Sequence, residues 1–175
     1  QATASAAVND TTATSGVSIA SGIQAPSATD IAEIKIVVGN VASGDTLDFG
    51  SGVTLDLASG SDLTGTSATI NSITGIDYSY NATSDTLTLS KNGGGNFTEA
   101  DVDNVVSGIL FETTATEDAG TRTFAISYVD DAGNEGTSAT QTLNVDTQAP
   151  DAVDLDNSNG ATVDATASSA VNDAT

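Results

Sequence analysis

The sequence predicts an all-β protein, an antiparallel sandwich of two sheets with one short helix. Apolar and polar residues alternate in a series of short runs, which is the pattern of strands with one buried face. These runs are rich in Thr, Val, Ile and Tyr, which favour strands, and Gly, Asn, Asp and Ser cluster between them. Several short strands bounded by turn residues at this spacing are typical of a sandwich.

The alternation places the strands along the chain. In chain order, we expect strands at residues 33–38, 46–49, 53–57, 68–73, 76–80, 85–90, 109–113, 121–129 and 137–145. The chain has four Phe, three Tyr and no Trp. We therefore expect the core between the sheets to consist largely of Ile, Leu, Val and Ala.

One segment has helical rather than strand periodicity, and it predicts a helix over about residues 98–108. Thr98 is a suitable N-cap, acidic residues occupy the first turn where the helix dipole favours them, and Gly108 can end the helix. We expect this helix to lie across the open end or edge of the sandwich. Its apolar residues recur at the spacing i, i+3, i+4, i+7: Val102, Val105, Val106 and Ile109.

The charge of the chain excludes several kinds of partner. Its 175 residues carry 3 Lys and Arg against 24 Asp and Glu, a net charge of −21. Such a chain has no basic face for phosphates, so we expect no nucleic-acid binding and no attraction to anionic membrane surfaces. No apolar run approaches the roughly 20 residues of a membrane-spanning helix, so we expect no membrane insertion.

The missing residue types limit the chemistry. The chain has no His, Cys, Met or Trp. This excludes disulfides, a Ser-His-Asp triad and the ordinary zinc, copper, haem and iron–sulfur sites. Paired carboxylates carry no signal in so acidic a chain, and a sugar-cleaving cleft would usually present Trp, so we do not expect an enzyme. Hard divalent cations, above all Ca²⁺, are the agents that could neutralise the charge and permit folding.

The chain contains an internal repeat. Residues 2–10 read ATASAAVND and residues 165–173 read ATASSAVND, so the two segments match at eight of nine positions. The alternative explanation is that Ala/Ser/Thr-rich sequence matches itself by composition. The repeat predicts one full unit of a tandem array and the beginning of the next. We assign residues 1–26 to the N-terminal junction and first strand, 27–146 to the sandwich, and 147–175 to a linker and the start of the next repeat.

Two stretches resemble a known class of repeat. Residues 124–136, FAISYVDDAGNEG, and 142–150, TLNVDTQAP, resemble the last hairpin and linker of bacterial immunoglobulin-like repeats. Residues 87–90, the helix, and residues 109–112 and 121–126 are similar to cadherin-like repeats of the same proteins. Together they cover roughly residues 85–151. The combination resembles modules of the giant RTX adhesins that Gram-negative bacteria export by type I secretion.

The resemblance implies an immunoglobulin/cadherin-like sandwich that serves as a stalk module of an extracellular adhesin on the bacterial cell surface. It implies calcium-dependent folding and rigidity, with neighbouring repeats of the same chain as partners and other cells or surfaces reached through a distal domain. The other function that the sequence leaves open is ligand binding, in which loops 39–45, 58–67 and 91–97 contact a glycan, a peptide or a surface. Self-association of modules in a biofilm is compatible with both.

Acidic and amide residues at the module junction are the main candidates for Ca²⁺ ligands. Calcium prefers six to eight oxygen ligands, which carboxylates on a short linker can supply. The alternative is a solvated acidic linker without an ordered ion. The candidates are four acids around the linker, the Asn-Asp pair of the following unit and the equivalent pair at the start of this one: Asp146, Asp151, Asp154, Asp156, Asn172, Asp173, Asn9 and Asp10.

Other charged residues have simpler explanations. The run Asp130-Asp131-Ala132-Gly133-Asn134-Glu135 predicts a hairpin turn with a positive φ at Gly133 or Asn134, although Asp130, Asp131 or Glu135 could also donate oxygens to an ion at the end of the sandwich. Acids of the predicted helix suit its first turn, with metal binding as the alternative: Glu99, Asp101 and Asp103. For Lys35 and Arg122 we expect local ion pairs.

Overall fold

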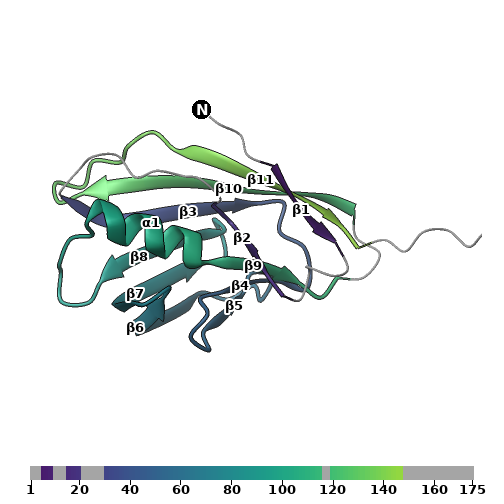
Figure 1. The fold of residues 1–175 in the computed structure, drawn as a ribbon, viewed down its shortest axis with the longest axis horizontal. Helices are drawn as coiled ribbons and strands as arrows, with labels where there is room; N and C mark the ends of the chain where they lie inside the picture. Colours follow the sequence, from purple (N-terminus) through teal and green to yellow (C-terminus); the bar gives the residue numbers. More distant parts are fainter. Residues whose placement is uncertain (1–4, 10–14, 21–29, 116–118, 148–175) are drawn as a thin grey trace, which may run out of the picture.

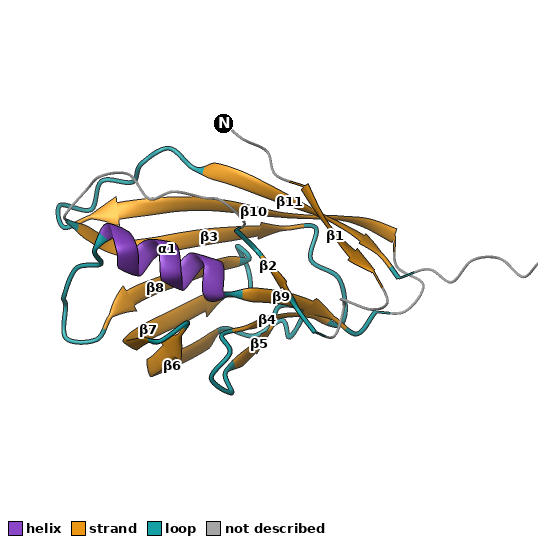
Figure 2. Cartoon of the chain, viewed as in Figure 1, coloured by secondary structure: helices purple, strands orange, loops and turns teal. Residues whose placement is uncertain are grey.

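The computed structural model describes residues 5–9, 15–20, 30–115 and 119–147. These residues form two layers (Figures 1 and 2). The larger layer is a seven-stranded sheet in the order β1-β11-β10-β3-β8-β7-β6, and the smaller is a four-stranded sheet in the order β2-β9-β4-β5. The predicted all-β sandwich with one short helix is confirmed, and every strand pair is antiparallel except β1 with β11.

The strands have the following bounds. The seven-stranded sheet contains β1 (Ser5–Asn9), β11 (Ala139–Asp146), β10 (Ala119–Asp130), β3 (Ile31–Gly39), β8 (Thr86–Lys91), β7 (Ile73–Asn81) and β6 (Leu63–Ile70). The four-stranded sheet contains β2 (Val17–Ser18), β9 (Leu110–Thr113), β4 (Asp45–Asp48) and β5 (Thr54–Asp56). The segment assigned to the N-terminal junction, residues 1–26, thus contributes one short strand to each sheet.

The core lies between the two layers and follows the alternation of the sequence. In β3, for example, Ile34, Ile36 and Val38 are buried, whereas Val37 is 43% exposed. Aliphatic residues dominate the core, as expected, but all four Phe residues are also buried in it. Phe111 of β9 and Phe124 of β10 meet edge to face across the core, with ring centroids 5.8 Å apart. This contact joins the small sheet to the large one.

Helix α1 (Glu99–Gly108) forms where the sequence predicts it. Thr98 is its N-cap, and the Thr98 hydroxyl and the Asp101 carboxylate exchange hydrogen bonds with each other's backbone N–H in a capping box. Val102, Val105 and Val106 are buried in the core. Figure 1 shows the helix running directly into β9 and covering the part of the large sheet that the small sheet leaves open. It is therefore part of the second layer and does not lie along an edge of the sandwich.

The structure corrects the prediction for residues 58–73. The predicted strand at 68–73 is wrong, because β6 ends at Ile70 and β7 begins at Ile73, with a two-residue turn between them. Asn71 and Ser72 both have positive φ, 45° and 71°, as the tight hairpin turn requires. Residues 63–67, expected within a loop, belong to β6 and carry few apolar side chains. A bulge at Ser67, with φ 58°, interrupts their pairing with β7.

The three basic residues of the chain all pair with carboxylates. Lys35 Nζ lies 2.8 Å from Glu135, Lys91 Nζ lies 2.6 Å from Asp101, and Arg122 Nε lies 2.5 Å from Asp45. The local ion pairs expected for Lys35 and Arg122 are confirmed. In the part of the chain that the structure describes, no helix is long and apolar enough to cross a membrane.

Candidate functional site

Those residues predicted to bind calcium that the structure describes lie at two opposite ends of the sandwich. Asp146, at the end of β11, pairs in register both with Asn9 at the end of β1 and with Ala119 at the start of β10. Asp130 ends β10, so it lies about 36 Å away along that strand at about 3.3 Å per residue. We call these the Asp146 pole and the Asp130 pole. One ion cannot contact both.

The Asp146 pole holds the part of the predicted junction site that the structure describes. The pairing of β1 with β11 brings Asn9 and Asp146, which are far apart in the sequence, to matching positions. The Asp146 side chain is exposed, while the next residue, Thr147, is buried and its Oγ1 donates a 2.8 Å hydrogen bond to the Ala115 carbonyl. The remaining junction candidates lie outside the described residues: Asp10, Asp151, Asp154, Asp156, Asn172 and Asp173.

At the Asp130 pole the acids mainly stabilise their own turn. Asp130 Oδ1 accepts hydrogen bonds from the backbone N–H groups of Ala132 and Asn134, at 2.9 and 2.8 Å. The side chain and backbone of Asn134 are the main reasons why the pKa of Asp130 lies below its ordinary value. Gly133 has φ +83°, as the sequence predicts for this turn. The carboxylate of Asp130 is therefore a structural part of the hairpin.

The carboxylate of Glu135 also accepts hydrogen bonds from neighbouring side chains. Its Oε1 accepts a 2.6 Å hydrogen bond from Ser127 Oγ and its Oε2 a 2.8 Å bond from Lys35 Nζ. The bond from Lys35, followed by that from Ser127, lowers the pKa of Glu135. Both oxygens thus accept hydrogen bonds from side chains of β3 and β10, which leaves Asp131 as the acid of this turn that faces a neighbouring loop.

Asp131 lines a groove of about 350 Å³ beside the glycine-rich loop 91–97. Its Oδ2 accepts a 2.9 Å hydrogen bond from Asn96 Nδ2, which connects the loop to the turn. Glu33 and Asp77 also line this groove, but Asn92 donates to both oxygens of Asp77. Among the described residues, no three acidic side chains converge closely enough to hold a metal ion.

Among the acids of the helix, Asp101 has a structural role. Asp101 Oδ2 accepts hydrogen bonds from Lys91 Nζ at 2.6 Å and from the Thr98 backbone N–H at 3.0 Å. The ammonium of Lys91, which also lies over the Phe97 ring, and the Thr98 N–H hold the pKa of Asp101 below its ordinary value. The carboxylate of Asp101 thus ties the start of the helix to the end of β8, and the first-turn explanation accounts for it.

Replacing Asp101 with Asn is expected to change how stability depends on pH. Because the pKa of Asp101 is lowered by folding, its contribution is present above the ordinary pKa and is lost as the pH falls through the lowered value. Asp101→Asn should therefore lower the free energy of unfolding at pH 7 by about 1 kcal/mol, the typical effect of a capping residue. Urea unfolding of both chains at pH 7 and at pH 3 measures the loss in the free energy of unfolding and its dependence on pH.

The difference between Asp101→Asn and the parent chain should shrink at the lower pH, because pH 3 lies below the ordinary pKa and the stabilisation by the charge is lost as the pH falls towards the lowered pKa of Asp101. Glu99→Gln is the matched control, because Glu99 is exposed in the same turn and should contribute only a few tenths of a kcal/mol through the helix dipole. An equal loss at both pH values would contradict the role given to the Asp101 charge.

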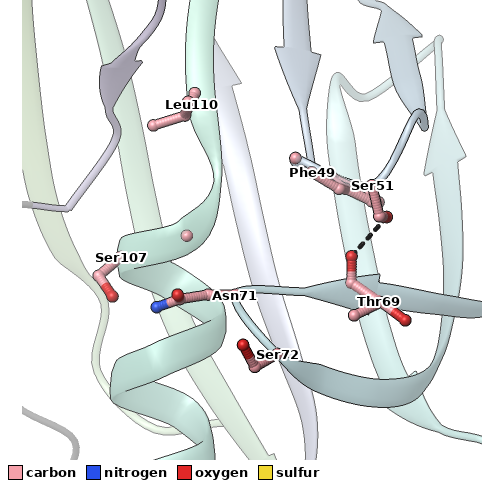
Figure 3. Close-up of a pocket in the computed structure, with 9 residues that line it drawn as sticks. Phe49, Ser51, Thr69, Asn71, Ser72, Ser107 and Leu110 are labelled. Atoms are coloured by element: carbon pink, nitrogen blue, oxygen red, sulfur yellow. Dashed lines mark hydrogen bonds between the residues drawn. The ribbon is translucent and has the colours of Figure 1, made fainter.

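A larger groove, of about 550 Å³, lies where the helix, the β6–β7 turn and the β4–β5 turn meet (Figure 3). Its lining contains no charged residue. Ser51 Oγ donates to the Thr69 carbonyl at 2.5 Å, and Asn71 Nδ2 donates to the Asn104 carbonyl at 3.2 Å. None of the loops 39–45, 58–67 and 91–97 lines this groove, whereas loop 91–97 lines the smaller one.

Comparisons with protein-family models, with curated proteins and with solved structures find no match for this chain. The resemblance to immunoglobulin-like and cadherin-like adhesin repeats therefore stays a prediction from the sequence.

Proposed function

We propose that this chain is a structural repeat of a bacterial cell-surface adhesin. In this proposal it is an immunoglobulin/cadherin-like module that extends a tandem array outside the cell and holds a distal binding domain away from the surface. Calcium at the module junction folds and stiffens the array, and the module itself catalyses no reaction. Its partners are the neighbouring repeats of the same chain.

The parallel pairing of β1 with β11 is the observation that carries the proposal. The first and last described strands lie side by side over Ser5–Asn9 and Thr142–Asp146 and run in the same direction. The chain therefore enters and leaves the sandwich while travelling the same way along two paired strands, of which β11 lies roughly along the long axis in Figure 1. A module with this connectivity passes the chain onward from one unit to the next, as an end-to-end array requires.

Charge supports the placement of calcium at the Asp146 pole. The chain carries 24 acidic residues, and its three cations are taken up by Asp45, Asp101 and Glu135 inside the module. Within ten residues after Asp146, the sequence supplies three further aspartates, Asp151, Asp154 and Asp156. Extracellular modules bind calcium with Kd of about 10⁻⁴ to 10⁻³ M. Such sites fill outside the cell and stay empty in the low-calcium cytosol, where an exported chain must remain unfolded.

Thermal unfolding in chelator, in calcium and in magnesium at matched ionic strength tests the proposal. An ion that binds only the folded chain adds RT ln(1 + [L]/Kd), about 2.7 kcal/mol at one hundred times Kd. For a chain of this size, this corresponds to a rise in Tm of about 5–10 °C. We expect that rise with calcium and little with magnesium. For two consecutive units, the maximum dimension from small-angle scattering should also increase with calcium.

Asp146→Asn should reduce the calcium-dependent rise, because it removes one carboxylate from the junction. Asp62→Asn is the matched control, because Asp62 is exposed and precedes β6, at the opposite edge of the large sheet from β1 and β11. Equal rises with calcium and magnesium would indicate general charge screening and would favour the ligand-binding function. An unchanged dimension of the two-unit chain would contradict the stiffening role.

A further inference from the structure

β1 is one of two nearly identical segments in the chain. Its residues Ser5–Asn9 pair at five positions with Thr142–Asp146 and form the edge of the seven-stranded sheet. The segment 168–172, which we call the second copy, reads SSAVN where β1 reads SAAVN. The one difference, Ala6 against Ser169, falls at the position opposite Leu143. The segment that pairs with the edge of β11 thus occurs twice in the chain, with almost the same sequence.

The second copy is close enough along the chain to reach the same edge. The 21 residues from 147 to 167 separate it from the end of β11. To pair as β1 does, residue 168 must come back to Thr142, four residues before Asp146, a distance of about 13 Å along the strand. Twenty-one residues can span up to about 70 Å, and a parallel connection needs about a dozen. The connection is therefore long enough.

We propose that residues 168–172 can replace β1 at the edge of β11 within the same chain. The pairing depends mainly on backbone hydrogen bonds, which two segments of such similar sequence form alike. A tethered segment acts at an effective concentration in the millimolar range, so a segment of the same molecule is favoured over one from another molecule. The replacement keeps the backbone of β11 covered when β1 detaches, and it prevents an exposed edge that would recruit other chains.

The full chain carrying Ala6→Pro and Ala7→Pro tests this inference. In an edge strand, one of any two consecutive residues directs its N–H to the neighbouring strand, so two successive prolines remove a donor in either register. Amide hydrogen exchange should then show protection of residues 142–146 within about tenfold of the parent chain. Residues 168–172 should gain protection, and light scattering should show a monomer.

Two matched variants complete the test. Ser169→Pro with Ala170→Pro should leave residues 142–146 as protected as in the parent, because β1 is intact. All four prolines together should remove the protection of those backbone N–H groups in residues 142–146 that face β1, whereas the N–H groups that pair with β10 stay protected and are not part of this readout. The inference is overturned if Ala6→Pro with Ala7→Pro loses protection as fully as the fourfold variant, or unfolds. It is also overturned if protection survives in a dimer, survives without a gain at residues 168–172, or survives all four prolines. None of these readouts depends on calcium or on the proposed stalk function.

Discussion

Replacing Arg122 with Met is expected to lower the free energy of unfolding by about 3–5 kcal/mol, the usual cost of breaking a buried ion pair from one side. Arg122 of β10 and Asp45 of β4 are both almost fully buried, with side chains 4% and 0% exposed. The pair joins the large sheet to the small one. In Arg122→Met, the Asp45 carboxylate keeps one backbone donor, the Ala42 N–H at 2.8 Å, but has no countercharge.

The double variant Arg122→Met with Asp45→Asn should recover much of this loss, because it leaves no buried charge while the amide oxygen of the new side chain can still accept from Ala42. Lys35→Met is the matched control, since the Lys35–Glu135 pair is 33% and 46% exposed and should contribute at most about 1 kcal/mol. Urea unfolding at one ionic strength compares all three. Similar losses for Arg122→Met and Lys35→Met would show that burial does not govern the effect.

Most of the strands and the helix could be predicted because their sequences carry the physical pattern of a half-buried element. Ile34, Ile36 and Val38 alternate with less buried residues, and the structure buries all three. Val102, Val105 and Val106 share one helical face, and Thr98 supplies the cap. In each case, local periodicity and burial act together, so a single sequence is sufficient.

The sequence could not show features that depend on distant parts of the chain. Asp45 and Arg122 are 77 residues apart, and nothing local marks Asp45 as buried. Residues 64–67 lack the apolar alternation of the other strands, so the sequence predicts too short a strand for β6 and places its turn at Asn71 and Ser72 in a strand. The parallel pairing of β1 with β11 is likewise set by topology and not by local pattern.

The candidate site was predictable only in part for the same reason. Acidic composition pointed to calcium, but it did not distinguish acids that are exposed from acids that build turns. Asp130 could be recognised as a turn residue from the Gly133-Asn134 that follows it. The bonds from Ser127 and Lys35 that occupy Glu135 come from other strands and leave no mark in the local sequence. The sequence does not show that Asn9 pairs with Asp146, because the strand order of the sheet sets this pairing.

Replacing Phe124 with Ala should also destabilise the chain strongly, by about 3–5 kcal/mol, the usual loss when a buried aromatic residue is truncated. Phe124 is fully buried in the middle of β10, where it pairs with Val38 and Gln141. Its ring meets Phe111 of the small sheet at an angle of 63°. The substitution therefore removes apolar contact area and a contact between the layers at the same place.

Val37→Ala provides the comparison, because Val37 lies on the neighbouring strand opposite Ala125 but is 43% exposed. It should change the free energy of unfolding by less than about 0.5 kcal/mol. Since one core connects both sheets and the helix, Phe124→Ala should still unfold in a single transition. Two separate transitions would contradict this, because they would mean that the sheets unfold independently. A module that transmits tension along an array requires the two layers to behave as one unit, so this cooperativity bears directly on the proposed stalk.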